Sequence, residues 1–191
     1  MEKRTKKKEQ DGQQESLEHQ SLEVSMLNKD SFSDEELESY LSKGAIRASD
    51  EITVPPKILF VGDCTIATFG NFSASTGKAK SKKTFNISAM VAAAVTNSTV
   101  LNYRACLPEG KRTILYFDTE QSKYHCHTVL ERIYRLSGLS LKKDDPRLMF
   151  WGLREYTPKL RIAVIDYALR KYEGVGLVII DGLRDLMYDI N

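Results

Sequence analysis

The sequence predicts an α/β protein in which helices cover both faces of a mainly parallel sheet. From Lys57 onward, apolar runs typical of strands alternate with segments of helical periodicity. The runs are almost continuously apolar, as expected for parallel strands that are buried on both faces. With 191 residues, of which 41% are hydrophobic, the chain is large enough for one domain with one core.

The first part of the chain is predicted to lie outside this core. Residues 1–32 are polar, charged and rich in glutamine, so we expect a disordered tail that buries too little surface to become ordered. The tail begins with a basic cluster, which either contacts nucleic acid or, as the simpler interpretation, stays solvated. Ser33 and Glu36 form a capping-box pattern that starts a short helix, and residues 33–56 are read as this helix and a linker.

The core is predicted to span residues 57–191, and its first half contains three strands and a helix. Residues 58–61 are an apolar run of strand formers, and residues 65–68 read as the returning strand of a hairpin. Residues 71–75 are predicted as the next strand. Residues 85–96 are dense in alanine, valine, isoleucine and methionine, which indicates a helix buried against a sheet.

The second half of the core repeats the alternation of strand and helix. Residues 113–117 form an apolar strand, and residues 122–137 form an amphipathic helix that a glycine follows. Residues 148–152 form a short strand. A helix is expected from Pro158 to about residue 172, because proline is favoured in a first helical turn. Residues 176–180 form the last apolar strand.

One loop of the core matches the phosphate-binding pattern G-x-x-x-x-G-K-[ST], the P-loop, with one exception. Gly77, Lys83 and Thr84 occupy three of the defined positions, whereas Lys82 stands where the pattern has its second glycine. In such a loop, backbone amides and the start of the following helix surround a phosphate. The lysine neutralises the β- and γ-phosphate oxygens, and the hydroxyl binds Mg²⁺. The predicted nucleotide contacts are Gly77, Lys78, Ala79, Lys80, Ser81, Lys82, Lys83, Thr84 and Phe85.

The side chain at Lys82 restricts the backbone of this loop, because residues other than glycine disfavour a positive φ. We therefore expect a right-handed backbone at Lys82, or a locally remodelled loop. The additional lysines of the loop either strengthen the positive potential around the phosphates or coat a surface loop.

Acidic residues follow two of the predicted strands. Asp181 comes directly after residues 176–180 and is expected to hold Mg²⁺ through water, together with Thr84. Glu120 follows residues 113–117 and is expected to polarise the water that attacks the γ-phosphate. The carboxyl ends of parallel strands share the edge at which ligands bind in open α/β sheets. We therefore predict ATP and Mg²⁺ as cofactors at that edge, with Glu120 and Lys83 as catalytic residues.

Residues that lie near these motifs carry simpler predictions. Arg184 and Asp185 are expected to form a local ion pair, with contact to a partner as the alternative. Trp151 is expected to pack in the core rather than to stack on a nucleic-acid base. The three cysteines show no paired spacing, which favours free thiols in a reducing compartment.

The motif segments resemble those of the RecA-like P-loop ATPases. The similar segments are residues 72–85, 114–121 and 178–185, and the resemblance covers about Lys57 to the end of the chain. It is greatest to hexameric replicative helicases of the plasmid RepA type and to related ATPases of bacterial mobile elements. It implies a three-layer P-loop NTPase fold in which the roles of base and Walker B acid belong to Glu120 and Asp181.

The resemblance also implies a function. ATP hydrolysis would be coupled to the handling of DNA during replication, excision or mobilisation of a mobile element. The expected partners are nucleotide, single-stranded DNA and further copies of the chain, which form a hexamer in the helicases. The sensor residue, DNA-contacting loops and arginine finger of such domains cannot be assigned to residues of this sequence. Because Asn191 follows Asp181 closely, we expect the core to be truncated at its C-terminus, either as a fragment or as a shortened domain.

Two other functions compete with this one. The first is a nucleotide-binding adaptor or helicase-loading module that binds ATP without hydrolysing it. The second is a small-molecule kinase, which the lack of a lid-like insertion and the presence of Glu120 disfavour. The sequence has no Asn-Lys-x-Asp element of the kind that GTP-specific P-loop proteins carry, so ATP is preferred. It also shows no secretion signal and no apolar run long enough for a membrane span, so we expect a cytoplasmic protein.

Overall fold

The computed structural model describes residues 32–77 and 82–187, which fall into two compact units, Met1–Ile52 and Thr53–Asn191. The predicted tail lies outside the described residues except for Phe32. In the first unit, helix α2 spans Asp34–Gly44 and has no buried residue.

The predicted capping box is present at the start of α2. The Glu36 amide donates to Ser33 Oγ over 3.2 Å, and the Ser33 amide donates to Glu36 Oε2 over 2.8 Å. These two bonds satisfy amides that the helix itself leaves without acceptors. Because α2 buries no side chain, its start is defined by this local bonding and not by packing.

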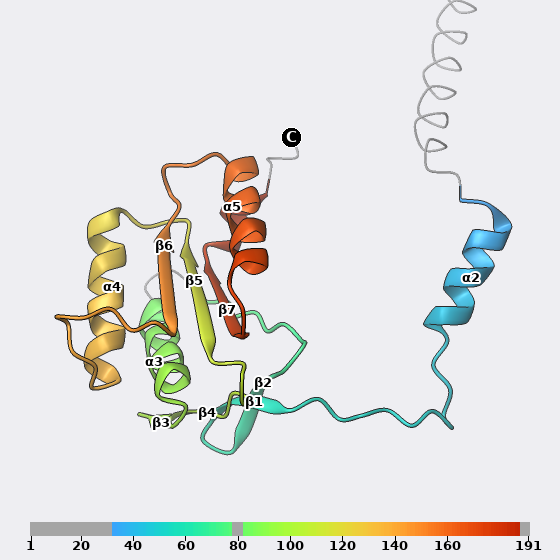
Figure 1. Ribbon diagram of the computed structural model, residues 1–191, viewed down its shortest axis with the longest axis horizontal. Helices are drawn as coiled ribbons and strands as arrows, with labels where there is room; N and C mark the ends of the chain where they lie inside the picture. The colour runs from blue at the N-terminus through green and yellow to red at the C-terminus, as the bar shows by residue number, and fades with distance from the viewer. Residues whose placement is uncertain (1–31, 78–81, 188–191) are drawn as a thin grey trace, which may run out of the picture. The chain divides into compact units, whose positions relative to one another are not determined.

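The second unit contains a parallel three-stranded sheet in the order β6-β5-β7 (Figure 1). Strand β5 spans Thr113–Asp118, β6 spans Leu148–Gly152 and β7 spans Val175–Asp181. Both outer strands run parallel to β5. The predicted α/β class and parallel sheet are therefore confirmed for these three strands.

Helices cover both faces of this sheet, as Figure 1 shows. Helices α3 (Lys83–Thr96) and α4 (Lys123–Leu136) pack on one face, and α5 (Pro158–Lys171) packs on the other. Helix α5 begins as predicted, with Pro158 in its first turn and the Thr157 side chain as its cap.

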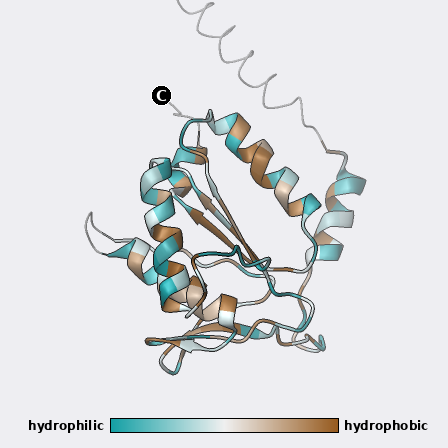
Figure 2. Ribbon diagram, turned by 60° about the vertical axis from the view of Figure 1, so that its left-hand side comes forward, coloured by the Kyte–Doolittle hydropathy of each residue, from teal (hydrophilic) through white to brown (hydrophobic). Residues whose placement is uncertain are grey.

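The alternation of side chains along β5 explains its continuous apolar sequence. Ile114 and Tyr116 belong to the core cluster shared with α3 and α4, whereas Leu115 and Phe117 belong to the cluster shared with α5. All four side chains are fully buried. In Figure 2 the strands of this sheet are largely hydrophobic, whereas the helices beside them mix hydrophobic and hydrophilic residues.

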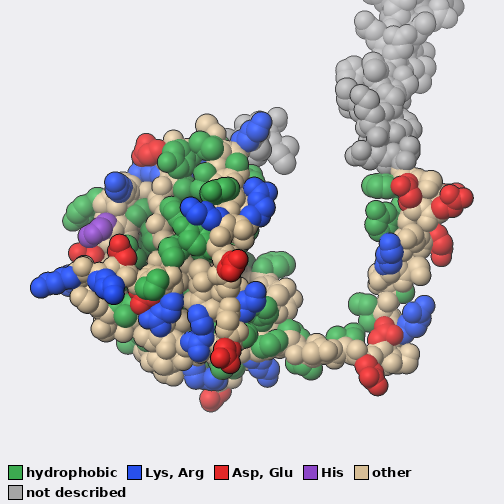
Figure 3. All heavy atoms as spheres, viewed as in Figure 1, with side chains coloured by type: hydrophobic (Ala, Val, Ile, Leu, Met, Phe, Trp, Pro, Cys, Tyr) green, Lys and Arg blue, Asp and Glu red, His purple; other side chains and the backbone are tan. Residues whose placement is uncertain are grey.

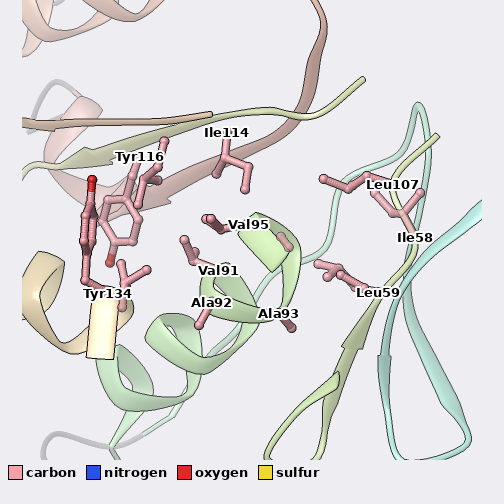
Figure 4. Close-up of a cluster of buried hydrophobic side chains, with 14 of the residues drawn as sticks. Ile58, Leu59, Val91, Ala92, Ala93, Val95, Leu107, Ile114, Tyr116 and Tyr134 are labelled. Atoms are coloured by element: carbon pink, nitrogen blue, oxygen red, sulfur yellow. The ribbon is translucent and has the colours of Figure 1, made fainter. Parts of the chain in front are cut away.

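Helix α3 connects this sheet to a second, antiparallel sheet. Val91 and Val95 of α3 lie near Ile114 and Tyr116 of β5, and the same cluster continues to Leu59 (Figure 4). The antiparallel sheet has the order β2-β1-β4-β3. Its strands are β1 (Lys57–Val61), β2 (Cys64–Thr68), β3 (Thr99–Val100) and β4 (Tyr103–Ala105).

The prediction of a mainly parallel sheet is thus wrong for the apolar run at residues 58–61. This run forms β1, which pairs antiparallel with β2 and β4 and has no neighbour in the parallel sheet. A tight turn at Gly62, with φ of +53°, returns the chain into β2, as the predicted hairpin requires. The pairing with β4 was not predicted, because β3 and β4 are short and their residues read as loop.

The strand predicted at residues 71–75 is also absent, since residues 71–77 form no regular structure. Phe72 is 94% exposed, and its small neighbours offer little apolar surface to bury. The Ser73 hydroxyl donates to the Ile66 carbonyl over 2.6 Å, and Asn71 Nδ2 donates to Thr68 Oγ1 over 2.8 Å. These side-chain bonds hold the segment beside the end of β2, and no strand pairs with it.

Two smaller predictions have different outcomes. Trp151 packs in the core as expected, stacked on Phe117 with ring centroids 4.9 Å apart. The ion pair expected between Arg184 and Asp185 is not among the salt bridges of the described residues. Both residues lie in the short 3-10 helix η2 (Leu183–Leu186), in which Asp185 approaches Thr119 instead.

Candidate functional site

The candidate site lies at the edge where the three parallel strands end. Asp118 is the last residue of β5 and Asp181 the last of β7, and the two are paired in the sheet register. Glu120 follows β5 after one further residue. The parallel arrangement therefore places all three carboxylates at one edge of the sheet, as the sequence predicts.

Asp181 is held from inside the core by Tyr116. The Tyr116 hydroxyl donates to Asp181 Oδ2 over 3.1 Å. Burial and the charge of Asp118 raise the pKa of Asp181, while interactions with Tyr116, Thr84 and the charge of Lys83 lower it. Thr84 and Lys83 are thus near Asp181, although almost a hundred residues separate them in the sequence.

Helix α3 begins two residues earlier than predicted and therefore includes Lys83 and Thr84. Both residues lie in the first turn of the helix, where backbone amides have no acceptor within the helix. Lys83 Nζ donates to the Gly77 carbonyl over 3.2 Å, so the lysine closes the loop back on its first residue. Lys78, Ala79, Lys80 and Ser81, four of the predicted nucleotide contacts, lie outside the described residues. Phe85 is in the first turn as well, and its amide donates to the Lys82 carbonyl.

The prediction of a right-handed backbone at Lys82 is wrong. Lys82 has φ of 59° and ψ of 25°, which is the left-handed conformation that glycine adopts without strain. Lys82 therefore adopts, despite its side chain, a backbone conformation that favours glycine. Non-glycine residues in this region cost about 1–3 kcal/mol and are concentrated at functional sites.

Glu120 lies in an acidic environment with one cation nearby. Its pKa is raised, first by burial and then by the charges of Asp181, Asp185 and Asp118, and Lys83 opposes this shift. Because Glu120 is an exposed residue in the loop between β5 and α4, its desolvation is weak, and the three neighbouring acids are the more secure cause of the raised pKa. A raised pKa makes Glu120 a better proton acceptor, which is what activation of water requires.

Asp118 is the first of the two acids that end this strand in the sequence, and it has the role that acids after strands commonly have, which is to cap the loop that follows. It is fully buried, and its carboxylate accepts hydrogen bonds from the Glu120 amide, the Gln121 amide and Gln121 Nε2, over 3.1, 2.7 and 2.8 Å. These bonds satisfy the buried charge and shape the loop that carries Glu120. The carboxylate of Asp118 is therefore engaged in hydrogen bonds with the loop that follows β5.

Tyr116 was also missed by the sequence analysis. A signal existed, because a tyrosine inside a buried strand needs a hydrogen-bond partner for its hydroxyl. The sequence could not identify that partner, since Asp181 lies 65 residues away and only the register of β5 with β7 brings the two together.

Groups of opposite charge meet at this edge of the sheet. The first turn of α3 and Lys83 supply positive potential, and Asp181 and Glu120 supply acidic side chains. Within residues 32–77 and 82–187, no group of three or more His, Cys, Asp or Glu side chains is arranged to hold a metal ion.

The charged side chains on the surface are mixed in sign. On the face shown in Figure 3, Lys and Arg side chains are scattered among acidic and hydrophobic ones, so this view singles out no basic groove for nucleic acid. In the part of the chain that the structure describes, no helix is both long and apolar enough to cross a membrane.

Comparison of the chain with protein-family models, curated proteins and solved structures finds no match.

Proposed function

We propose that this chain binds ATP with Mg²⁺ at the carboxyl edge of its parallel sheet and is part of a RecA-like ATPase. The observation that carries the proposal is the convergence of three distant segments. The charge of Lys83 acts on the pKa values of both Asp181 and Glu120, and Thr84 acts on that of Asp181. Among the described residues, Lys83 forms no salt bridge with either acid. An incomplete glycine pattern is a weak signal by itself, and the strand expected directly before the loop is absent. The proposal is therefore supported by the position of the first turn of α3 near the acids that follow β5 and β7.

Each residue of the proposed site has its own role in binding or hydrolysis. The amides at the start of α3 and the Lys83 ammonium bind phosphate oxygens. Thr84 and Asp181 would hold Mg²⁺. When bound, the metal neutralises charge on the phosphates. Glu120 orients a water molecule and accepts its proton, for which the raised pKa is favourable.

The wider assignment rests on the sequence resemblance. The α/β fold with helices on both faces of a parallel sheet is compatible with a RecA-like core. Coupling to single-stranded DNA, assembly into a homo-oligomer and a role in a mobile element are proposed from the resemblance of the motif segments alone.

The first test is equilibrium binding of ATP with and without Mg²⁺, together with phosphate release with and without single-stranded DNA. Magnesium-dependent binding and DNA-stimulated release are the expected results. Binding without release would support the alternative of a nucleotide-binding adaptor. A chain that binds no ATP under any of these conditions would refute the proposal.

The matched variants are Lys83→Ala and Lys123→Ala. Loss of the Lys83 ammonium removes a charged hydrogen bond, so ATP affinity should fall roughly 10- to 100-fold. Lys123 is exposed at the start of α4, and its replacement should leave the affinity unchanged. Equal affinities of the two variants would contradict the assignment of Lys83.

A further inference from the structure

Arg161 connects two of the loops at the site edge. It lies near the start of α5, and its guanidinium is half-buried. Arg161 Nε donates to the Leu153 carbonyl over 3.0 Å, Nη2 to the Arg154 carbonyl over 2.7 Å and Nη1 to the Asp185 carbonyl over 2.7 Å. The first two acceptors belong to the loop after β6 and the third to η2, so one planar side chain joins both loops.

The η2 segment is in turn fixed against the loop that carries Glu120. The Thr119 amide donates to the Asp181 carbonyl over 3.0 Å, and Thr119 Oγ1 donates to the Gly182 carbonyl over 2.7 Å. Thr119 is 1% exposed. A Cβ at Gly182 would lie 2.2 Å from Thr119 Oγ1 and 2.6 Å from Glu120 Cγ. The turn after β7 and the Thr119–Glu120 segment are therefore in direct contact.

We infer that Arg161 is a positioning residue for Glu120 and Asp181. Its hydrogen bond to Asp185 holds the turn after β7 in place, and Thr119 transmits that position to Glu120. The inference rests on the proposed function, because it assigns Arg161 to the same site. In P-loop chemistry most of the rate comes from positioning and electrostatics, so small displacements of Glu120 are costly.

A competing explanation is that Arg161 only stabilises the fold. It predicts that loss of the side chain lowers stability while hydrolysis by the folded protein stays unchanged. The positioning role predicts instead a local loosening of two loops and a lower kcat, with the affinity for ATP retained, because the bond between Lys83 and Gly77 does not involve Arg161.

The test compares Arg161→Lys and Arg161→Gln with Arg170→Gln in the full chain. Lysine keeps the charge but lacks the planar fork that reaches three carbonyls. Arg170 lies on the same helix, is exposed and pairs only with Asp166 across one turn, so it serves as the control. Amide hydrogen exchange is followed by NMR, and ATP hydrolysis is measured at saturating Mg²⁺.

Faster exchange is expected at Thr119 and Asp185 in both Arg161 variants, with exchange in β5 unchanged. We expect kcat to fall roughly 10- to 100-fold and KM for ATP to change little. Unchanged exchange at Thr119 and Asp185 would overturn the inference, as would faster exchange with an unchanged kcat. Absence of ATP hydrolysis in the wild-type protein would refute the proposed hydrolysis, and hydrogen exchange alone would then decide the role of Arg161.

Discussion

At the scale of single residues, the candidate site depends on two side chains in demanding positions. Lys82 occupies a left-handed backbone conformation at the start of α3, and Tyr116 places a hydroxyl inside the core against Asp181. Each position has a measurable energetic consequence, because strain and buried hydrogen bonds contribute to stability as well as to the geometry of the site.

Replacing Lys82 with glycine should stabilise the protein. Glycine adopts the observed φ of 59° without the strain of about 1–3 kcal/mol that another residue carries. Its greater loss of backbone entropy on folding offsets about 0.5–1 kcal/mol of that relief, so the free energy of unfolding should rise by about 1 kcal/mol. Urea denaturation measures the change. Lys82→Ala is the control, because it removes the charge but keeps the Cβ and should give no gain. An equal effect of both substitutions would show that charge, and not backbone strain, determines the stability of this position.

Replacing Tyr116 with phenylalanine should weaken the metal dependence of ATP binding. The change removes the hydroxyl that donates to Asp181 Oδ2, so Asp181 loses its fixed position, and the free energy of unfolding falls by about 1–2 kcal/mol. The Mg²⁺ concentration needed for half-maximal ATP binding should rise several-fold.

Tyr134→Phe is the matched control for this prediction. The Tyr134 hydroxyl is also buried in the core, where it accepts a hydrogen bond from the Asp145 amide over 2.7 Å, away from the site edge. It should lower stability without changing the Mg²⁺ titration. If both variants shift the titration equally, Tyr116 has no specific role at Asp181.

At the scale of secondary-structure elements, the turn after β7 is the most constrained connection of the site. Gly182 has φ of +100° and is packed against Thr119 and Glu120. Gly70 has φ of +80°, but the position that a Cβ would occupy there has no other atom within 4 Å. The two glycines therefore separate the cost of backbone strain from the cost of close packing.

Gly182→Ala should be much more destabilising than Gly70→Ala. Both substitutions strain the backbone by about 1 kcal/mol or more. Only the added methyl group at Gly182 must displace Thr119 and Glu120, which adds about 1–3 kcal/mol and should also reduce ATP hydrolysis. Urea denaturation and phosphate release measure the two effects. Similar losses in both variants would mean that the turn yields easily and does not hold Glu120.

At the scale of the whole molecule, the sequence predicted local structure better than contacts between distant segments. The helices and the parallel strands follow from apolar periodicity and from helix-start signals such as Ser33 and Pro158, which act within a few residues. The strand predicted at residues 71–75 does not form because a strand also needs a neighbouring strand to pair with. The right-handed backbone predicted for Lys82 is wrong because the intrinsic preference of the residue does not decide its conformation at the start of α3.

The contacts that organise the site were beyond prediction for the same reason. Tyr116 meets Asp181, and Thr119 meets Gly182, only through the register of β5 with β7. Three hydrogen bonds of Arg161 likewise join segments that no local pattern relates. The sequence could therefore propose which residues carry the chemistry, but not which residues position them.

The accumulation of acids at the site edge should make the ligand-free protein less stable as the pH rises. The pKa values of Asp181 and Glu120 are raised above their ordinary 3.8 and 4.5. A carboxyl group with a raised pKa binds its proton more tightly in the folded than in the unfolded state. Its contribution to stability is therefore lost as the pH rises from the ordinary pKa through the raised one.

Asp181→Asn should remove part of this dependence. The variant should melt a few degrees above wild type at pH 7, and the difference should shrink toward pH 4, because a raised pKa of Asp181 stabilises the wild-type protein only where the carboxyl group is protonated. Thermal unfolding at a series of pH values measures it. Asp166→Asn is the control, since Asp166 is exposed and paired with Arg170. A variant that is less stable than wild type at pH 7 would show that Asp181 is compensated within the chain and that the site does not need a cation.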